Sequence, residues 1–343
     1  LCRFDAAEAD ALRKVLSKRD RERRLPSFRH RFLKSGEAAG VSIESLEKVW
    51  DMILSFEGYS FCKAHSASYA LLSYRLAWMK RYYPLQFMAS VVNNGGGYYS
   101  RQVYLNATRR MGFRVMPPDI NRSGENYSVE GAGTAACLRT GLSQLHDLGP
   151  SHLAGILDER QKSGHFRSLQ DFLTRAAPAH RVFRALVRSG SLDSIAGNYS
   201  RPAMFWKYAQ GSRDDLLFGP PPVPRCIGEY SPKRKLFDER ESLGLFISCH
   251  PSALFLARGK RAALAAGLPS PIDSRGIPSA LGGTVCVVGC FVTAKEVITK
   301  RNRQMSFLSF EDRFSVFEAV AFPDVYSRIL PALDLGSAFL VTG

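Results

Sequence analysis

Three basic residues near the start of the chain are spaced so that a helix would gather their charges on one side. Arg13, Lys14 and Lys18 lie in the run Asp10–Arg19. Residues about one turn apart share a helix face, so two or three cationic groups could converge on a cluster of phosphate oxygens. A run of Lys and Arg is also common on a solvated helix face. The residues alone leave both interpretations open.

A second basic pair, Lys63 and His65, follows a turn around Gly58. The apolar pattern after it predicts a helix from about Ser66 to Tyr83, which places both residues just ahead of the helix N-terminus. Such a terminus offers unpaired N–H groups and partial positive charge to an anion. A lone histidine in this place can equally be a cap or a structural hydrogen bonder.

The stretch from residue 141 to 160 predicts two short helices joined by a tight turn, the helix-hairpin-helix. This motif points backbone N–H groups at a DNA phosphate and holds duplex DNA without reading its sequence. Asp147 stands where the first glycine of the turn is usual; Asp tolerates the left-handed conformation, but its carboxylate weakens the grip on phosphate. A merely structural αα-hairpin is the alternative. The candidate DNA-binding residues are Leu148, Gly149, Ser151 and Arg160.

A looser second copy covers residues 165–193. Its basic residues could touch phosphates, but we expect it to serve chiefly as scaffolding. Further on, a short acidic and apolar peptide precedes a proline-rich linker at residues 219–224. Large apolar side chains on exposed chain are typical of an anchor for a partner's pocket, although packing on the neighbouring helical domain would also bury them. The residues of this peptide are Asp214, Asp215, Leu216, Leu217 and Phe218.

A basic turn followed by strand aromatics lies near the C-terminus. Oligonucleotide-binding folds use such charge for the backbone of a single strand and such rings for its bases. Regular alternation would place Ser306, Leu308 and Phe310 on one face of the strand. Phe307 and Ser309 would share the other face, so at most one of the two phenylalanines can be an exposed platform. The candidate single-strand contacts are Lys300, Arg301, Arg303, Phe307 and Phe310.

The elements that must position these residues indicate several domains, mainly α-helical and followed by a small β-barrel. The chain has 343 residues, more than one compact core usually takes. We expect helices at about 42–54, 66–83, 84–94 and 100–111, short helices from 138 to 210, and one helix within 232–278. Stretches rich in Val and Phe predict strands at 284–297, 305–311, 314–322 and 339–341. The last strand runs into the C-terminus, so we expect the barrel to be cut short.

The composition favours a polyanionic partner. Lys and Arg number 47 against 31 Asp and Glu, a formal charge of +16. Solubility alone or anionic lipid are the alternatives. Seven scattered cysteines include no CxxC pair, which predicts a reduced, cytoplasmic setting and no zinc site. Cys286 and Cys290 are expected to share one strand face as small core residues. No apolar run is long enough to span a bilayer.

Three segments of the sequence closely resemble the alpha subunit of bacterial DNA polymerase III: Phe56–Tyr74, Tyr82–Ala89 and Met116–Asn121. The resemblance continues, in the same order along the chain, nearly to residue 343. The resemblance implies that residues 1–115 end the fingers, 116–210 form tandem hairpins beside the product duplex, 211–278 are a linker, and 279–343 are part of an OB-fold near the single-stranded template. Leu1 then looks like a truncated start.

The resemblance also implies residue roles. Arg13, Lys14 and Lys18 would face the triphosphate of the incoming dNTP or a nearby DNA phosphate, with Lys63 and His65 near the same pocket. The peptide from Asp214 to Phe218 would dock on the sliding clamp, although Asp214 replaces the usual leading Gln. Other holoenzyme subunits are possible partners, and a membrane is not expected.

Polymerase chemistry needs two Mg²⁺ ions held by carboxylates, which in this family belong to the palm. The chain has no Asp-x-Asp pair, no Gly-rich phosphate loop and no metal-spaced His/Cys cluster. We therefore expect a parent DNA-directed DNA polymerase, a fragment that is inactive alone, and no catalytic or metal-ligating residue in this chain. A non-enzymatic DNA-binding adaptor with helix-hairpin-helix and OB domains would explain the charge, but it gives no reason for the fingers-like strings.

Overall fold

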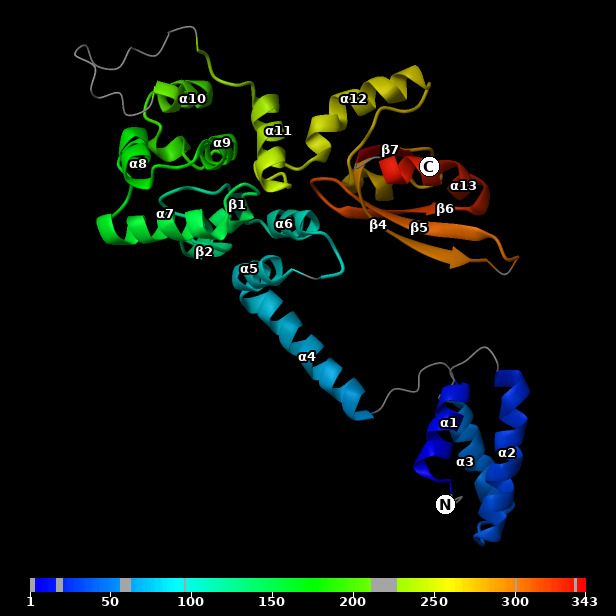
Figure 1. The fold of residues 1–343 in the computed structure, drawn as a ribbon. Helices are drawn as coiled ribbons and strands as arrows, with labels where there is room; N and C mark the ends of the chain where they lie inside the picture. Colours follow the sequence, from blue (N-terminus) through cyan, green and yellow to red (C-terminus); the bar gives the residue numbers. More distant parts are fainter. Residues whose placement is uncertain are drawn as a thin grey trace, which may run out of the picture. The chain divides into compact units, whose positions relative to one another are not determined.

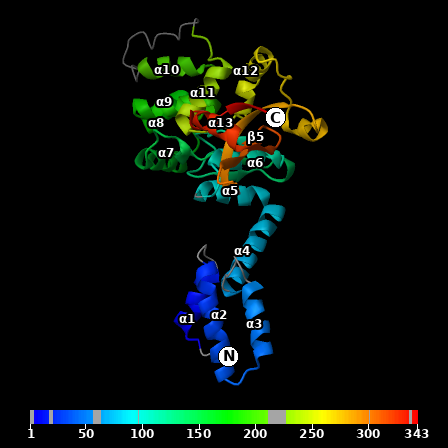
Figure 2. The same cartoon turned by 90° about the vertical axis from the view of Figure 1, so that its right-hand side faces the viewer.

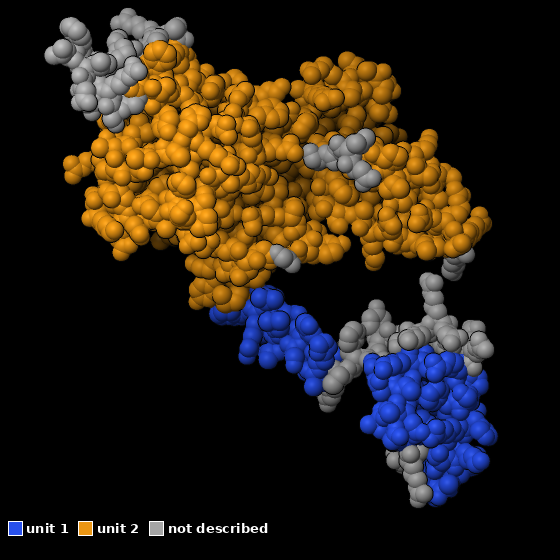
Figure 3. All heavy atoms as spheres, viewed as in Figure 1, with its two compact units in different colours: residues 1–78 blue, residues 79–343 orange. Residues whose placement is uncertain are grey.

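The computed structural model describes residues 4–16, 21–55, 63–95, 97–210, 227–299, 301–335 and 338–343. Contacts between residues divide the chain into two compact units, Leu1–Trp78 and Met79–Gly343 (Figure 3). None of the helices in the described ranges combines the length and apolarity needed to cross a membrane.

The described part of the first unit begins with three helices, α1 (Ala6–Leu16), α2 (Arg21–Ala38) and α3 (Ile43–Ser55). Their apolar faces meet in a small core, in which the rings of Phe32 and Trp50 lie 5.2 Å apart. Gly36 allows close approach, since a Cβ there would lie 2.3 Å from a methyl carbon of Leu46. Ser42 accepts a hydrogen bond from the N–H of Ser45, in agreement with the predicted helix start.

The limit between the two units falls within helix α4 (Lys63–Tyr82), after Trp78. The helix begins three residues earlier than predicted, so Lys63 and His65 lie in its first turn and not ahead of it. Pro84 opens the next helix, α5 (Pro84–Asn94), as expected for a residue without an N–H group. Helix α6 (Arg101–Arg110) follows.

The larger unit has a helical body built on a small sheet of β1 (Arg114–Met116), β3 (Cys137–Arg139) and β2 (Ser128–Glu130). β3 lies in the middle, parallel to β1 and antiparallel to β2. The helices are α7 (Pro150–Ser163), α8 (Leu169–Ala176), α9 (His180–Arg188) and α10 (Arg201–Gln210). Helices α5 and α6 contribute Leu85, Val92 and Leu105 to the same core.

A four-stranded antiparallel sheet follows near the C-terminus (Figures 1 and 2). Its strands are hydrogen-bonded in the order β6-β5-β4-β7. Its strands are β4 (Cys286–Ile298), β5 (Gln304–Glu311), β6 (Val316–Ala321) and β7 (Ala338–Thr342). All four were predicted. Cys286 and Cys290 are both buried, as expected. Helix α13 (Pro323–Leu335) was not predicted; it connects β6 to β7 and contacts β5 and β6.

The single helix predicted within 232–278 is wrong, because two α-helices occur there, α11 (Pro232–Leu243) and α12 (Ser252–Ala265), before a 3₁₀ segment at Ser274–Ala280. Gly244 ends α11 in the left-handed conformation, with φ 69°. Gly259 lowers the helix propensity of α12, but the packing requires it. A Cβ at Gly259 would lie 2.4 Å from Cγ2 of Val288 in β4.

Candidate nucleic-acid interface

The second predicted hairpin is the more regular of the two. Helices α8 and α9 are joined by residues 177–179, and Ser168 caps α8 by accepting the N–H of Asp171. Ala177 has the left-handed conformation, φ 38° and ψ 53°, and its N–H donates to the carbonyl of Leu173. A left-handed residue after a helix reverses the chain within a few residues. This copy is thus a well-formed hairpin, where the sequence had indicated a loose one.

The first predicted hairpin has no full first helix. Only a 3₁₀ turn, Leu142–Gln144, precedes α7. Asp147 does not use the left-handed conformation that an aspartate tolerates: in the described ranges the only non-glycine residues with positive φ are Ala177 and Asn302. The turn is fixed from outside, because the N–H of His146 donates to the carbonyl of Ser242 in α11 at 2.9 Å.

Asp147 joins the two hairpins. Its Oδ1 accepts a hydrogen bond of 2.6 Å from Nε of Arg181, and its Oδ2 lies 3.6 Å from Nη2 of Arg184. The hydrogen bond from Arg181 lowers the pKa of the Asp147 carboxyl. Both arginines lie on α9, one helical turn apart, and the side chain of Arg181 is 74% exposed. The start of α9 therefore lies beside the turn that precedes α7.

The four predicted hairpin residues have different surroundings. Leu148 is buried in the core, and Gly149 is the N-cap of α7, with Ser151 exposed in the first turn. Arg160 points inward: its Nη1 donates to the carbonyls of Ile120 and Ser123 at 2.8 and 2.7 Å. Arg160 thus fixes a loop of the body. Gly149 and Ser151 remain at the surface.

We call the following set the hairpin face: Gly149, Ser151 and His152 at the start of α7, and Arg181 and Arg184 on α9. The sequence interpretation named neither arginine and not His152 among its candidate contacts, although it allowed that basic residues of the second copy could touch phosphates. Their signal was present, since Arg181 and Arg184 stand three residues apart just after the second turn. N–H groups in the first turn of each helix have no acceptor within the helix. Together with two guanidinium groups they can bind phosphate oxygens.

The predicted triphosphate ligands lie in the first unit. Arg13 and Lys14 are exposed on α1, and both form ion pairs with Asp10, at 2.8 and 2.7 Å. These contacts, that with Lys14 first, lower the pKa of Asp10. His65 is exposed on α4 and contacts the ring of Tyr69 edge to face. Lys18 and residues 56–62, where the sequence predicts a turn around Gly58, lie outside the described residues.

The predicted single-strand contacts divide into core and surface. Ser306, Leu308 and Phe310 are all buried, which confirms the predicted alternation, and Phe310 packs against Phe291 and Phe317. The structure therefore places Phe310 in the core and leaves half-buried Phe307 on the opposite face.

Of the basic residues in the turn between β4 and β5, Arg301 is exposed. Arg303 forms an ion pair with Asp324 at the start of α13. Lys300 lies outside the described residues, as does the whole peptide Asp214, Asp215, Leu216, Leu217 and Phe218.

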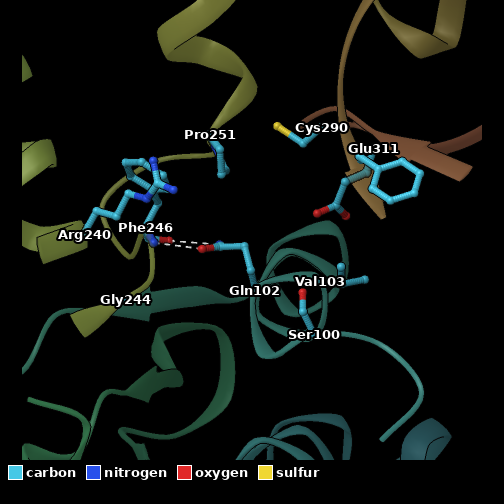
Figure 4. Close-up of a pocket in the computed structure, with 10 residues that line it drawn as sticks. Ser100, Gln102, Val103, Arg240, Gly244, Phe246, Pro251, Cys290 and Glu311 are labelled. Carbon is cyan, nitrogen blue, oxygen red and sulfur yellow. Dashed lines mark hydrogen bonds between the residues drawn. The ribbon is translucent and has the colours of Figure 1, made fainter. Parts of the chain in front are cut away.

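A cavity of about 190 Å³ lies between α6, the segment after α11, and the sheet (Figure 4). Gln102 holds one wall by two hydrogen bonds to the backbone of Phe246. Burial raises the pKa of Cys290 to about 12, so its thiol is a poor nucleophile. In the part of the chain that the structure describes, no three His, Cys, Asp or Glu side chains form a group that could hold a metal ion.

Comparison with known proteins identifies the region that carries the hairpin face. Residues 112–203, from just before β1 to the start of α10, match the model of a helix-hairpin-helix motif. The chain is 30% identical over 356 aligned residues to DNA polymerase III subunit alpha of Deinococcus radiodurans, covering 96% of this chain and 26% of that protein.

Two further subunits of that name give similar values. The one from Escherichia coli K12 is 28% identical, over 98% of this chain and 30% of its own length. The one from Thermus aquaticus is 33% identical, over 72% of this chain and 21% of its own length. The chain thus spans about a quarter of the length of the curated relatives it matches.

Proposed function

The chain is related over nearly its whole length to the alpha subunit of bacterial DNA polymerase III, and on this premise we propose that it is the DNA-holding portion of such a polymerase. The observation that carries the proposal is the hairpin face, which lies inside the region that matches a helix-hairpin-helix motif. Two helix N-termini and two arginines offer donors to the phosphates of a duplex. The surplus of positive charge supports the same partner.

The finer roles belong to this proposal. The four-stranded sheet belongs to an OB-fold, and Arg301 with Phe307 contacts the single-stranded template. Arg13, Lys14, Lys18, Lys63 and His65 contact the incoming dNTP. The domain limits at residues 115, 210 and 278, the cytoplasmic setting, and clamp docking through Leu217 and Phe218 stay predictions.

Mg²⁺ is the metal expected for the parent polymerase, but the described residues do not fit a two-metal site. Two buried carboxylates already have hydrogen-bond donors within the protein. Glu311 accepts from Asn106 and Arg110, and Asp312 accepts the N–H groups of Phe314 and Ser315. We propose that the chain alone does not extend a primer. Mg²⁺-dependent extension by the purified 343-residue chain would contradict this.

Binding of the full chain to a labelled duplex, followed by fluorescence anisotropy across a salt series, tests the hairpin face. Replacing Arg181 and Arg184 by Ala should weaken binding about tenfold and reduce the salt slope by about one to two, because two phosphate contacts are lost. The matched control is Arg258→Ala with Arg261→Ala, an exposed pair with the same spacing on α12. Equal losses in both variants would show that only overall charge matters and would reject the assignment.

A further inference from the structure

The residue that stands at the glycine position of the first hairpin turn is a carboxylate already bound to the arginines of the hairpin face. Asp147 contacts Arg181 at 2.6 Å and Arg184 at 3.6 Å, one with each carboxylate oxygen. A phosphodiester group presents oxygens with the same charge and similar spacing to the same donors. We propose that Asp147 is an internal competitor for DNA phosphate, which holds Arg181 and Arg184 in the DNA-free protein and lowers its affinity for duplex DNA. The inference rests on the proposed function of the hairpin face.

The geometry allows competition and not a permanent clamp. The Arg181 side chain is 74% exposed and that of Arg184 is 42% exposed, while the Asp147 side chain is 24% exposed. Ion pairs with an exposed partner are weak, because water and salt screen them. A duplex phosphate that releases counterions on binding can therefore displace the carboxylate. The carboxylate then remains within reach of the phosphate and repels it.

The backbone does not require a carboxylate at this place. Asp147 lacks a positive φ, and the turn is fixed by the hydrogen bond from the N–H of His146 to Ser242, which uses no side-chain atom of Asp147. A neutral side chain of the same shape can therefore occupy the position. Asp147→Asn removes the charge and keeps one oxygen acceptor for Arg181.

The test compares duplex binding of the full chain with that of Asp147→Asn at several salt concentrations. The variant should bind about two- to fivefold more tightly, which corresponds to the loss of one exposed ion pair. Its salt slope should increase by about one. The charge-matched control is Asp158→Asn, exposed on helix α7, which follows the turn that contains Asp147. It should change the affinity by less than about 1.5-fold, because screening weakens a distant charge.

Adding Asp147→Asn to the Arg181→Ala and Arg184→Ala variant should give no gain, because the competitor then has nothing to release. An affinity of Asp147→Asn equal to that of Asp158→Asn, or lower than wild type, overturns the inference. If the arginine variant still binds more weakly than its control, the proposed function survives that result. If the arginine variant matches its control as well, the hairpin face itself is refuted. Melting temperatures of each variant show whether a loss of binding comes from unfolding.

Discussion

The side-chain amide of Asn106 in α6 donates a hydrogen bond of 2.6 Å to the carboxylate of Glu311, 205 residues later at the end of β5. Arg110, one turn further along α6, donates to the other carboxylate oxygen at 2.9 Å. Glu311 is 2% exposed and Asn106 1%. Burial raises the pKa of Glu311, and the two donors oppose that effect. The carboxylate of Glu311 therefore joins the sheet to the helical body. Because this carboxylate is buried, water cannot replace its two protein donors.

Arg110→Ala should destabilise the larger unit by about 2–3 kcal/mol, because it leaves a buried carboxylate without its cation. Thermal or urea unfolding followed by tryptophan fluorescence measures the effect. The control is Lys235→Ala, which removes the partner of a more exposed carboxylate, Glu229, and should cost less than about 1 kcal/mol. Equal losses from the two variants would show that Glu311 does not depend on Arg110.

His250 should make the protein less stable in mild acid. Burial lowers its pKa to about 4, from an ordinary value of 6.5. The folded state therefore holds fewer protons than the unfolded state between these values, so stability is full above pH 6.5 and is lost as the pH falls toward 4. The loss between pH 7 and pH 5 should be roughly 1–2 kcal/mol.

His250→Gln should remove that part of the pH dependence, since Gln does not titrate. The difference between wild type and variant isolates His250 from Glu311, whose raised pKa acts in the opposite direction. Exposed His165→Gln is the control and should leave the profile unchanged. Parallel stability profiles for wild type and His250→Gln would contradict the prediction.

Two glycines near the first hairpin should respond differently to alanine. Gly141→Ala should destabilise the protein by more than about 2 kcal/mol, because its Cβ would lie 2.3 Å from the carbonyl oxygen of Glu125 and 2.6 Å from Cα of Asn126. Gly149→Ala should cost less than about 1 kcal/mol: φ is −66°, and the nearest atom, Nδ1 of His152, is 4.0 Å away. Urea midpoints measure both. A loss of stability above about 1 kcal/mol for Gly149→Ala would contradict the prediction, because it would show that a Cβ at this position has less space than the structure gives it.

Phenylalanines 307 and 310 should separate single-strand binding from stability. Phe310→Ala should destabilise the protein by about 3–5 kcal/mol, because Phe310 lies in the core of the sheet. Phe307→Ala should instead weaken binding of single-stranded DNA by about fivefold or more, through loss of a stacking surface, with a smaller change in melting temperature. Unchanged single-strand affinity for Phe307→Ala would place the platform elsewhere.

Local sequence patterns predicted the structure correctly where the pattern of one helix or strand determines which side chains are buried. Alternation along β5 correctly placed Ser306, Leu308 and Phe310 together, since a strand has a strict two-residue period. Helix α13 was missed because its pattern is interrupted at Pro331, and its value lies in covering β5 and β6. Propensity alone cannot show such a tertiary role.

Contacts between distant elements could not be predicted in the same way. Arg160 has the residue type and sequence position expected of a phosphate ligand, yet its guanidinium donates hydrogen bonds to the carbonyls of Ile120 and Ser123. Asp147 meets Arg181 34 residues later, across a turn whose conformation depends on Ser242. Each of these contacts depends on how two distant segments pack together, and the spacing of residues within one segment does not predict that packing.

The hydrogen bond between Asn106 and Glu311 cannot form until the ribosome has synthesised both α6 and β5. Ribosomes add about 5–20 residues per second, so β5 emerges roughly 10–40 s after α6, given their separation of 205 residues. Throughout that interval the polar groups of α6 that will be buried face solvent, and the helical body lacks one of its neighbours. We therefore expect nascent chains of this protein to pass through an incompletely packed stage, in which the helical body waits for the sheet that completes its contacts.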